Sequence, residues 1–285
     1  MMDAERRFGG IAALYGRAGL ERLRLAHVAV IGVGGVGSWV VEALARSALG
    51  RLTLVDMDHI AESNINRQLP ALSSTLGRAK IQVLAERITD INPATQIHLV
   101  DDFVEASNID GLLDTGFDAV IDCIDHYREK ALIIAGCRRR KQFVVTVGGM
   151  GGKVDPTRLG IADLSRTEKD SLLSRTRKEL RQRFGFPLNP KRRFAVPAVY
   201  STEDSILSPD GVHSCGIAGQ PSHLNCGGLG SATHVTATAG LFAVAVTLKR
   251  LAWPEGQPSH SRAKSWGASS WGASEEAPPV PAPID

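Results

Sequence analysis

Apolar runs alternate with segments of helical periodicity along the first half of the chain. Residues 27–33 form an apolar run of the fully buried kind, and residues 37–49 place apolar side chains at positions 40, 41, 44, 45 and 48. We expect Gly50 to end this helix and residues 51–58 to form a second strand. This strand–helix–strand unit predicts a parallel sheet with a right-handed crossover.

The alternation continues to about residue 150. It predicts helices near 78–90 and 128–140, and strands at 96–102, 119–125 and 143–149. We therefore expect an α/β fold: a doubly wound, Rossmann-like mixed sheet with helices on both faces. A smaller C-terminal α+β region is expected to extend it.

Composition places the chain in the ordinary globular class. It has 285 residues, 43% of them hydrophobic and 22% charged, and a net charge of +3. The N-terminus lacks the apolar core of a signal peptide, and the apolar stretch 235–248 is shorter than the ~20 residues that span a bilayer. We expect a buried helix there, no membrane association and a cytoplasmic location.

A glycine-rich turn follows the first strand. Gly32, Gly34 and Gly37 fit the GxGxxG pattern, which permits a tight turn and close approach of the backbone to a phosphate. Asp56 lies 19 residues after Gly37, at the end of the second strand, where it can accept hydrogen bonds from a ribose. In this context nucleotide binding is favoured over a turn that only packs tightly, but NAD and ATP both remain open.

Charged residues beyond the second strand favour ATP. Arg67 and Lys80 lie near Asn64, Asn66 and Gln68, and a DCID segment at 122–125 ends a later strand. Paired cations suit phosphoryl or nucleotidyl transfer, and a carboxylate at this edge can hold Mg²⁺. An isolated pair of charges would favour a solvated surface, and the aspartates could be strand-end caps. Their clustering at the carboxyl edge favours a site.

These motifs resemble a known superfamily. The glycine run, residues 54–58, 63–68 and 122–125, and Lys80 are similar to the adenylating domain of the ubiquitin-activating-enzyme-like (HesA/MoeB/ThiF) superfamily. Within it, the chain resembles the dehydratases of threonylcarbamoyladenosine in tRNA, over about residues 5–252. The motifs that carry this narrower resemblance are residues 7–16, 32–47, 55–58, 101–104, 148–159 and 235–244.

The resemblance implies an ATP-dependent ligase or dehydratase. ATP would convert the threonyl carboxylate next to the anticodon to an adenylate, and a carbamoyl nitrogen or oxygen would close a ring with net loss of water. The implied catalytic residues are Arg67, Lys80, Asp125 and an N-terminal arginine, Arg7, that reaches the phosphates of a second subunit in a homodimer. The implied nucleotide-binding residues are Gly32, Gly34, Gly35, Gly37, Asp56, Asp58, Asn64, Arg67, Gln68, Lys80, Asp125 and His126, with Mg²⁺ on Asp125.

Four parts of the chain follow from this interpretation. We expect an N-terminal helical segment at 1–20 that contributes Arg7 to the dimer, and an ATP-binding adenylating domain at 21–150. A substrate- and tRNA-contacting region with a C-terminal helix is expected at 151–252. Residues 253–285, rich in Ser, Ala and Pro, are expected to be a disordered tail.

Cysteine usage argues against zinc. None of Cys123, Cys137, Cys215 and Cys226 forms a CxxC pair, so we expect reduced thiols and no zinc site. Cys226 is the best candidate for a reactive thiol, but a buried structural role is favoured.

The stretch 166–194 is strongly basic and favours contact with tRNA phosphates over a merely solvated helix face. The runner-up is an adenylyltransferase for the C-terminus of a ubiquitin-like sulfur carrier. A non-catalytic scaffold for sulfur-transfer partners is a different class, and Arg67, Lys80 and Asp125 argue against it because a scaffold needs no phosphate and metal site. Sulfur-relay partners such as a cysteine desulfurase are expected as possible partners. An NAD oxidoreductase is the weakest candidate.

Overall fold

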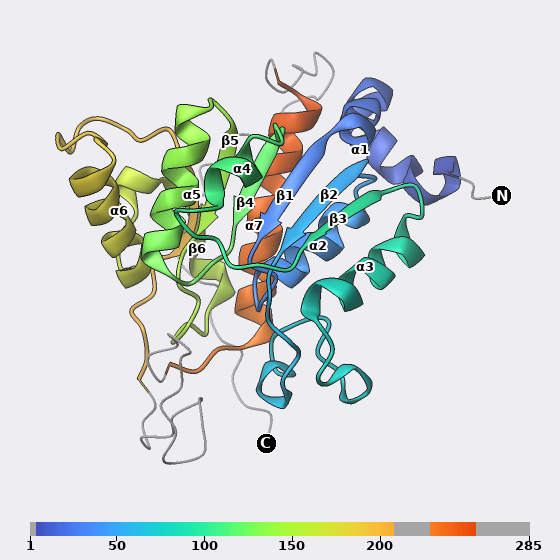
Figure 1. Cartoon of the computed structure of the whole chain (residues 1–285), viewed down its shortest axis with the longest axis horizontal. Helices are drawn as coiled ribbons and strands as arrows, with labels where there is room; N and C mark the ends of the chain where they lie inside the picture. The colour runs from blue at the N-terminus through green and yellow to red at the C-terminus, as the bar shows by residue number, and fades with distance from the viewer. Residues whose placement is uncertain (1–3, 208–228, 255–285) are drawn as a thin grey trace, which may run out of the picture.

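The computed structural model describes residues 4–207 and 229–254, which form one seven-stranded sheet (Figure 1). The strand order is β3-β2-β1-β4-β5-β7-β6; only β6 runs antiparallel to its neighbour. The strands are β1 (His27–Ile31), β2 (Arg51–Val55), β3 (Gln96–Val100), β4 (Ala119–Asp122), β5 (Phe143–Val147), β6 (Leu159–Asp163) and β7 (Pro197–Ser201). The predicted mixed sheet is confirmed.

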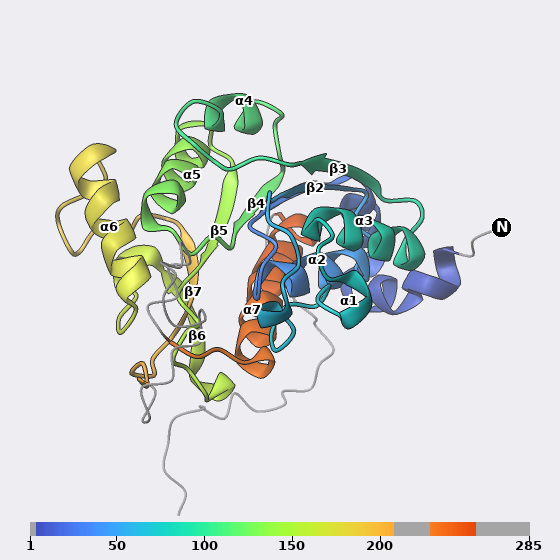
Figure 2. The ribbon, with the colours of Figure 1, turned by 60° about the horizontal axis from the view of Figure 1, so that its bottom comes forward.

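Helices cover both faces of this sheet, as Figure 2 shows. One face is covered by α1 (Ala4–Leu25), α2 (Gly37–Ala45), α3 (Lys80–Ile91) and α7 (Thr233–Ala252). The other is covered by α4 (Ile109–Leu113), α5 (Tyr127–Arg139) and α6 (Ser171–Arg183). Each set buries its apolar stripe in a separate core cluster, which contributes the main stabilisation of each layer. The described residues also contain four short 3₁₀ helices: η1 (Glu62–Asn64), η2 (Ser73–Thr75), η3 (Pro156–Arg158) and η4 (Leu164–Arg166).

The helix that follows the glycine turn, α2, is shorter than its periodicity predicts. α2 ends at Ala45, and a turn containing Ala48 at φ +62° leads to β2. Gly50 therefore does not cap the helix, and that expectation was wrong. A Cβ at Gly50 would lie 1.6 Å from the Arg24 carbonyl oxygen, so this glycine allows the end of α1 to pack against the start of β2.

The C-terminal apolar stretch forms a longer helix than expected. α7 has 20 residues and is long and apolar enough to cross a membrane by length and composition alone. It packs on α2 so closely that a Cβ at Gly240 would lie 2.8 Å from the Val36 carbonyl oxygen. Val235, Ala239 and Ala243 are fully buried in the core cluster, so α7 is a core helix of this fold.

The region after residue 150 shares the sheet with the region before it. β7 pairs in parallel with β5, and β6 adds the antiparallel edge. The division into parts at residues 20, 150 and 252 stays a prediction. Most of the predicted tail, residues 255–285, lies outside the described residues.

Candidate nucleotide-binding site

The glycine turn joins β1 to α2 at the carboxyl edge of the sheet. Gly32 has φ +83°, and a Cβ there would lie 3.2 Å from the backbone of Cys123 and Ile124. A Cβ at Gly37 would lie 1.8 Å from the Gly32 carbonyl oxygen. Both ends of the turn therefore require glycine, since side chains rarely adopt the first conformation and nothing larger than hydrogen fits at the second.

The two middle glycines adjoin the loop that follows β2. A Cβ at Gly34 would have only the Gln68 side-chain nitrogen nearby, at 3.8 Å, whereas one at Gly35 would lie 3.3 Å from Arg67 Cγ. Gln68 is buried, and its Oε1 has no hydrogen-bond partner among the described residues. A buried polar atom of this kind calls for a partner, which a bound ligand can supply.

Asp56 connects the turn to β2. Its Oδ2 accepts from the Val33 N–H at 2.7 Å and its Oδ1 from the Asp58 N–H at 2.9 Å. Burial raises the pKa of the Asp56 carboxyl above its ordinary value, against the opposing effects of Lys80 and these two N–H groups. The carboxyl is thus fixed beside the glycine turn, where it can accept from a ribose hydroxyl.

Lys80 begins α3 and is 4% exposed. Its Nζ lies 2.7 Å from Asp58 Oδ2, whose side chain is 52% exposed. The ammonium therefore lies below the surface, with a partner that water reaches. A phosphate could replace that partner without leaving a buried charge unpaired.

The loop carrying Arg67 is folded back on itself. Arg67 Nη1 donates to the Ser63 carbonyl at 2.7 Å and to Asn66 Oδ1 at 3.0 Å. Trp39 Nε1 donates to the Arg67 carbonyl at 3.1 Å. Asn64 is buried, and its Oδ1 accepts from the Ala61 N–H at 3.0 Å, which makes it a local cap. The structure thus brings Arg67 and Gln68 to the glycine turn, whereas the Asn64 side chain acts as a cap within its own loop.

The two aspartates of the DCID segment differ. Asp122 is completely buried: its Oδ2 lies 2.8 Å from Lys130 Nζ and accepts from the Thr146 hydroxyl at 2.7 Å, while its Oδ1 accepts from the Ile124 N–H. These contacts occupy Asp122 and remove it as a metal ligand. Asp125 is exposed, and it has no ion pair with a described residue.

A magnesium ion at Asp125 would need further ligands from a bound nucleotide. Within residues 4–207 and 229–254 no three His, Cys, Asp or Glu side chains form a metal-binding group. Mg²⁺ bound with a nucleotide commonly uses one or two carboxylates and completes its shell with phosphates and water. His126 precedes α5, and its Nδ1 lies against Glu129 Oε2.

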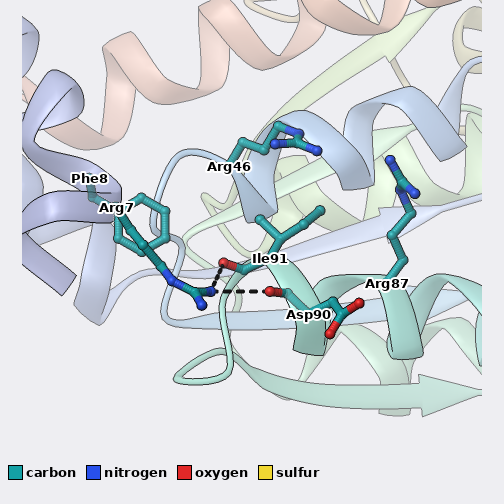
Figure 3. A pocket seen from close by; sticks show the side chains of 6 residues that line it. All are labelled: Arg7, Phe8, Arg46, Arg87, Asp90 and Ile91. Carbon is teal, nitrogen blue, oxygen red and sulfur yellow. Dashed lines mark hydrogen bonds between the residues drawn. The ribbon is translucent and has the colours of Figure 1, made fainter. Parts of the chain in front are cut away.

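The Arg7 side chain points to the backbone of Asp90 and Ile91 (Figure 3). Its Nη1 donates to the carbonyls of Asp90 at 3.1 Å and Ile91 at 2.7 Å, at the end of α3 opposite Lys80. Arg46 and Arg87, which both pair with Glu42, line the same surface pocket. In its own chain, Arg7 therefore caps the C-terminus of a helix.

Sequence reasoning missed the contacts that hold the site together. Lys130 and Thr146 complete the buried contacts of Asp122. Asn66 Nδ2 donates to the Ser231 carbonyl at 2.7 Å, which ties the Arg67 loop to the start of α7. The only signal in the sequence for the Lys130 contact was a lysine within the apolar pattern of residues 130–137. The sequence carried no signal for the contact between Asn66 and Ser231.

The described cysteines are poor nucleophiles. Burial raises the pKa of Cys123 well above its ordinary range and that of Cys137 to about 12. Cys215 and Cys226 lie outside the described residues.

The fold and this site define a protein of the adenylating class, and the chain belongs to the ThiF family, which it matches over residues 9–273. It is 50% identical over 248 residues to the tRNA threonylcarbamoyladenosine dehydratase of Haemophilus influenzae. The matched region covers 87% of this chain and 94% of that protein. The superfamily expected from the sequence is confirmed.

Solved structures agree with this assignment. The E. coli tRNA N6-threonylcarbamoyladenosine dehydratase in complex with ATP superimposes with a TM-score of 0.79 at 43% identity, covering 88% of this chain and 96% of that one. The same E. coli protein in complex with AMP gives the same TM-score, identity and coverage.

Proposed function

We propose that the protein catalyses ATP-dependent dehydration of threonylcarbamoyladenosine next to the anticodon of tRNA. The observation that carries the proposal is the glycine turn with buried Lys80 and fixed Asp56 beside it, in a chain that matches dehydratases along most of its length. ATP supplies the activation, because a free carboxylate resists attack whereas AMP is a good leaving group. Ring closure within one side chain then benefits from proximity.

The residues have separate roles in this proposal. Asp56 accepts from the ribose, the N–H groups of the glycine turn bind phosphate, and Gln68 Oε1 gains the partner that it lacks. Lys80 exchanges Asp58 for a phosphate oxygen, and Arg67 neutralises the charge that develops on the phosphates. Asp125 holds Mg²⁺, which offsets triphosphate charge when bound.

Several finer points belong to the same proposal. Arg7 acts on the phosphates of a second copy in a homodimer, since it lies at the far end of α3 from Lys80 in its own chain. The location is cytoplasmic, and the reaction class is that of a ligase because ATP is split to AMP and pyrophosphate. Sulfur-relay partners would act elsewhere, because this reaction needs no protein thioester.

The alternative function is that of an adenylyltransferase for a sulfur-carrier protein. The names of the relatives favour tRNA over a protein as the substrate. The test is incubation of the protein with tRNA bearing threonylcarbamoyladenosine, ATP and Mg²⁺. Mass spectrometry of the digested tRNA should give a nucleoside lighter by one water, with AMP formed in equal amount. An unchanged nucleoside, with folded protein that binds ATP, rejects the proposal.

A further inference from the structure

The charge of the chain is concentrated in one segment. Residues 171–193 contain eight Lys and Arg and one Glu, a net charge of +7, in a chain whose total is +3. All the other residues together therefore carry a net charge of −4. This asymmetry is stronger than the overall charge suggests, and clustered cations of this kind are typical of a polyanion-binding surface.

The structure separates the cations of this segment into two groups. Arg177 donates to the Thr167 hydroxyl, Arg181 donates to the Pro187 carbonyl at 3.2 Å and lies over Phe194, and Arg183 pairs with Glu179 at 3.0 Å. These three cations contact other residues of the protein. The other five are exposed and have no ion pair with a described residue: Arg175, Lys178, Lys191, Arg192 and Arg193. We call these five the basic flank.

Helical geometry aligns part of the basic flank. Ser171, Arg175, Lys178 and Gln182 are all exposed and spaced to lie on one stripe of α6, opposite buried Leu173 and Leu180. No carboxylate lies on that stripe. Asp170, the acid next to it, is buried, and its carboxylate accepts from the N–H groups of Leu173 and Gly149.

The same contacts connect the basic flank to the site. Gly149 follows β5, the strand beside β4, so the start of α6 lies at the sheet edge that carries Asp125. The 13 residues of α6 then extend about 20 Å, and the chain returns to the opposite edge, where Asp163 accepts from the Phe194 N–H. The basic flank therefore runs from the site along the side of the molecule where α6 forms the outer layer (Figure 1).

We infer that the basic flank binds the phosphates of the anticodon stem while the modified nucleotide lies beside the bound ATP at the sheet edge. This rests on the proposed function, which places a loop nucleotide of tRNA at the sheet edge. A stem leading away from the loop needs positive charge along a path from the site, and double-stranded RNA is bound largely through its backbone and shape.

The test variant replaces Arg175, Lys178, Arg192 and Arg193 with Gln. Fluorescence anisotropy with labelled, unmodified tRNA should show an increase in Kd of about tenfold or more at physiological salt. The slope of log affinity against log salt should fall in magnitude by about 3, since each lost phosphate contact removes about 0.7–0.9. With modified tRNA, KM for tRNA should rise while kcat and KM for ATP stay unchanged.

A matched control removes the same charge elsewhere. It replaces four exposed cations outside the basic flank with Gln: Arg17, Arg51, Lys141 and Lys249. The control should bind tRNA nearly as tightly as the unaltered protein. Equal weakening in both variants, or none in either, overturns the inference. So does loss of binding to phosphatidylserine vesicles with tRNA binding intact.

Failure of the proposed function gives a different result. If the unaltered protein leaves modified tRNA undehydrated but only the test variant loses tRNA affinity, the function is wrong and the docking surface stands. If dehydration proceeds and the test variant keeps its tRNA affinity and KM, the function stands and the docking surface is wrong.

Discussion

Two lysines at the carboxyl edge of the sheet pair with aspartates in opposite ways. Lys130 and Asp122 are both completely buried, and Thr146 completes their contacts. Lys80 is nearly as buried, but its partner Asp58 is half exposed. The comparison distinguishes a pair that stabilises the fold from a pair that can bind a ligand. The closed pair leaves no place for a ligand, whereas the open pair can exchange its carboxylate for a phosphate.

The largest expected effect comes from breaking the closed pair. Lys130→Met leaves Asp122 as a buried charge without a cation, and we expect the free energy of unfolding to fall by about 3–5 kcal/mol. Urea denaturation measures it. Adding Asp122→Asn should restore most of the loss, because an amide can still accept from Ile124 and donate to Thr146. A loss below about 1 kcal/mol for Lys130→Met would refute this account of the pair.

The same substitution in the open pair, Lys80→Met, should affect activity rather than stability. Lys80→Met leaves Asp58 in water, so we expect stability to change by about 1 kcal/mol or less. AMP formation with modified tRNA should fall by about a hundredfold or more, since a cation on the phosphates is lost. Denaturation and a quenched AMP assay on one preparation measure both. A large stability loss with normal turnover would reverse the assigned roles.

Asp163 is a third case, a carboxylate held by hydrogen bonds alone, and its expected effect is the smallest. Burial opposes its ionisation, but donors from Ser165, Phe194 and Val196 outweigh burial and hold the pKa of Asp163 below its ordinary value. Its stabilisation is therefore complete above the unfolded pKa of about 3.9 and is lost as pH falls through the lower folded pKa.

Asp163→Asn should accordingly cost about 1 kcal/mol at neutral pH, and the difference from the unaltered protein should shrink in strong acid. Denaturant titrations between pH 7 and about pH 2 check this, because the window lies below the unfolded pKa. A difference that grew as pH fell would show that the carboxylate is not the stabilising form.

The sequence was sufficient for what depends on local pattern. Gly32 and Gly37 were identified from their spacing, and the structure shows why a Cβ is excluded at both. The order of most strands and helices between residues 27 and 149 followed from periodicity, and Asp56 and Lys80 were singled out by their place at the end of the second strand and beyond it. These features depend on neighbours close in the chain, so one sequence contains them.

What the sequence lacked depends on how distant elements pack. Lys130 pairs with Asp122 because α5 lies over β4, and Gly50 is required because the Arg24 carbonyl at the end of α1 approaches it. Nothing in the local pattern separates Asp122, which is enclosed, from Asp125, which is exposed. The nucleotide-binding and catalytic roles assigned to the site residues, Asp56, Arg67 and Lys80 as much as Arg7, Asp125 and His126, all stay predictions, because they involve a bound nucleotide or a second subunit.

Transfer of oxygen tests the central claim, activation of the threonyl carboxylate by ATP, most directly. The measurement uses tRNA whose threonylcarbamoyl carboxylate is labelled with ¹⁸O, incubated with the protein, ATP and Mg²⁺. Adenylation bonds a carboxylate oxygen to the α-phosphorus, and ring closure then releases AMP with that oxygen. The account predicts one labelled oxygen in each AMP formed. Unlabelled AMP, accompanied by dehydrated nucleoside, would contradict it.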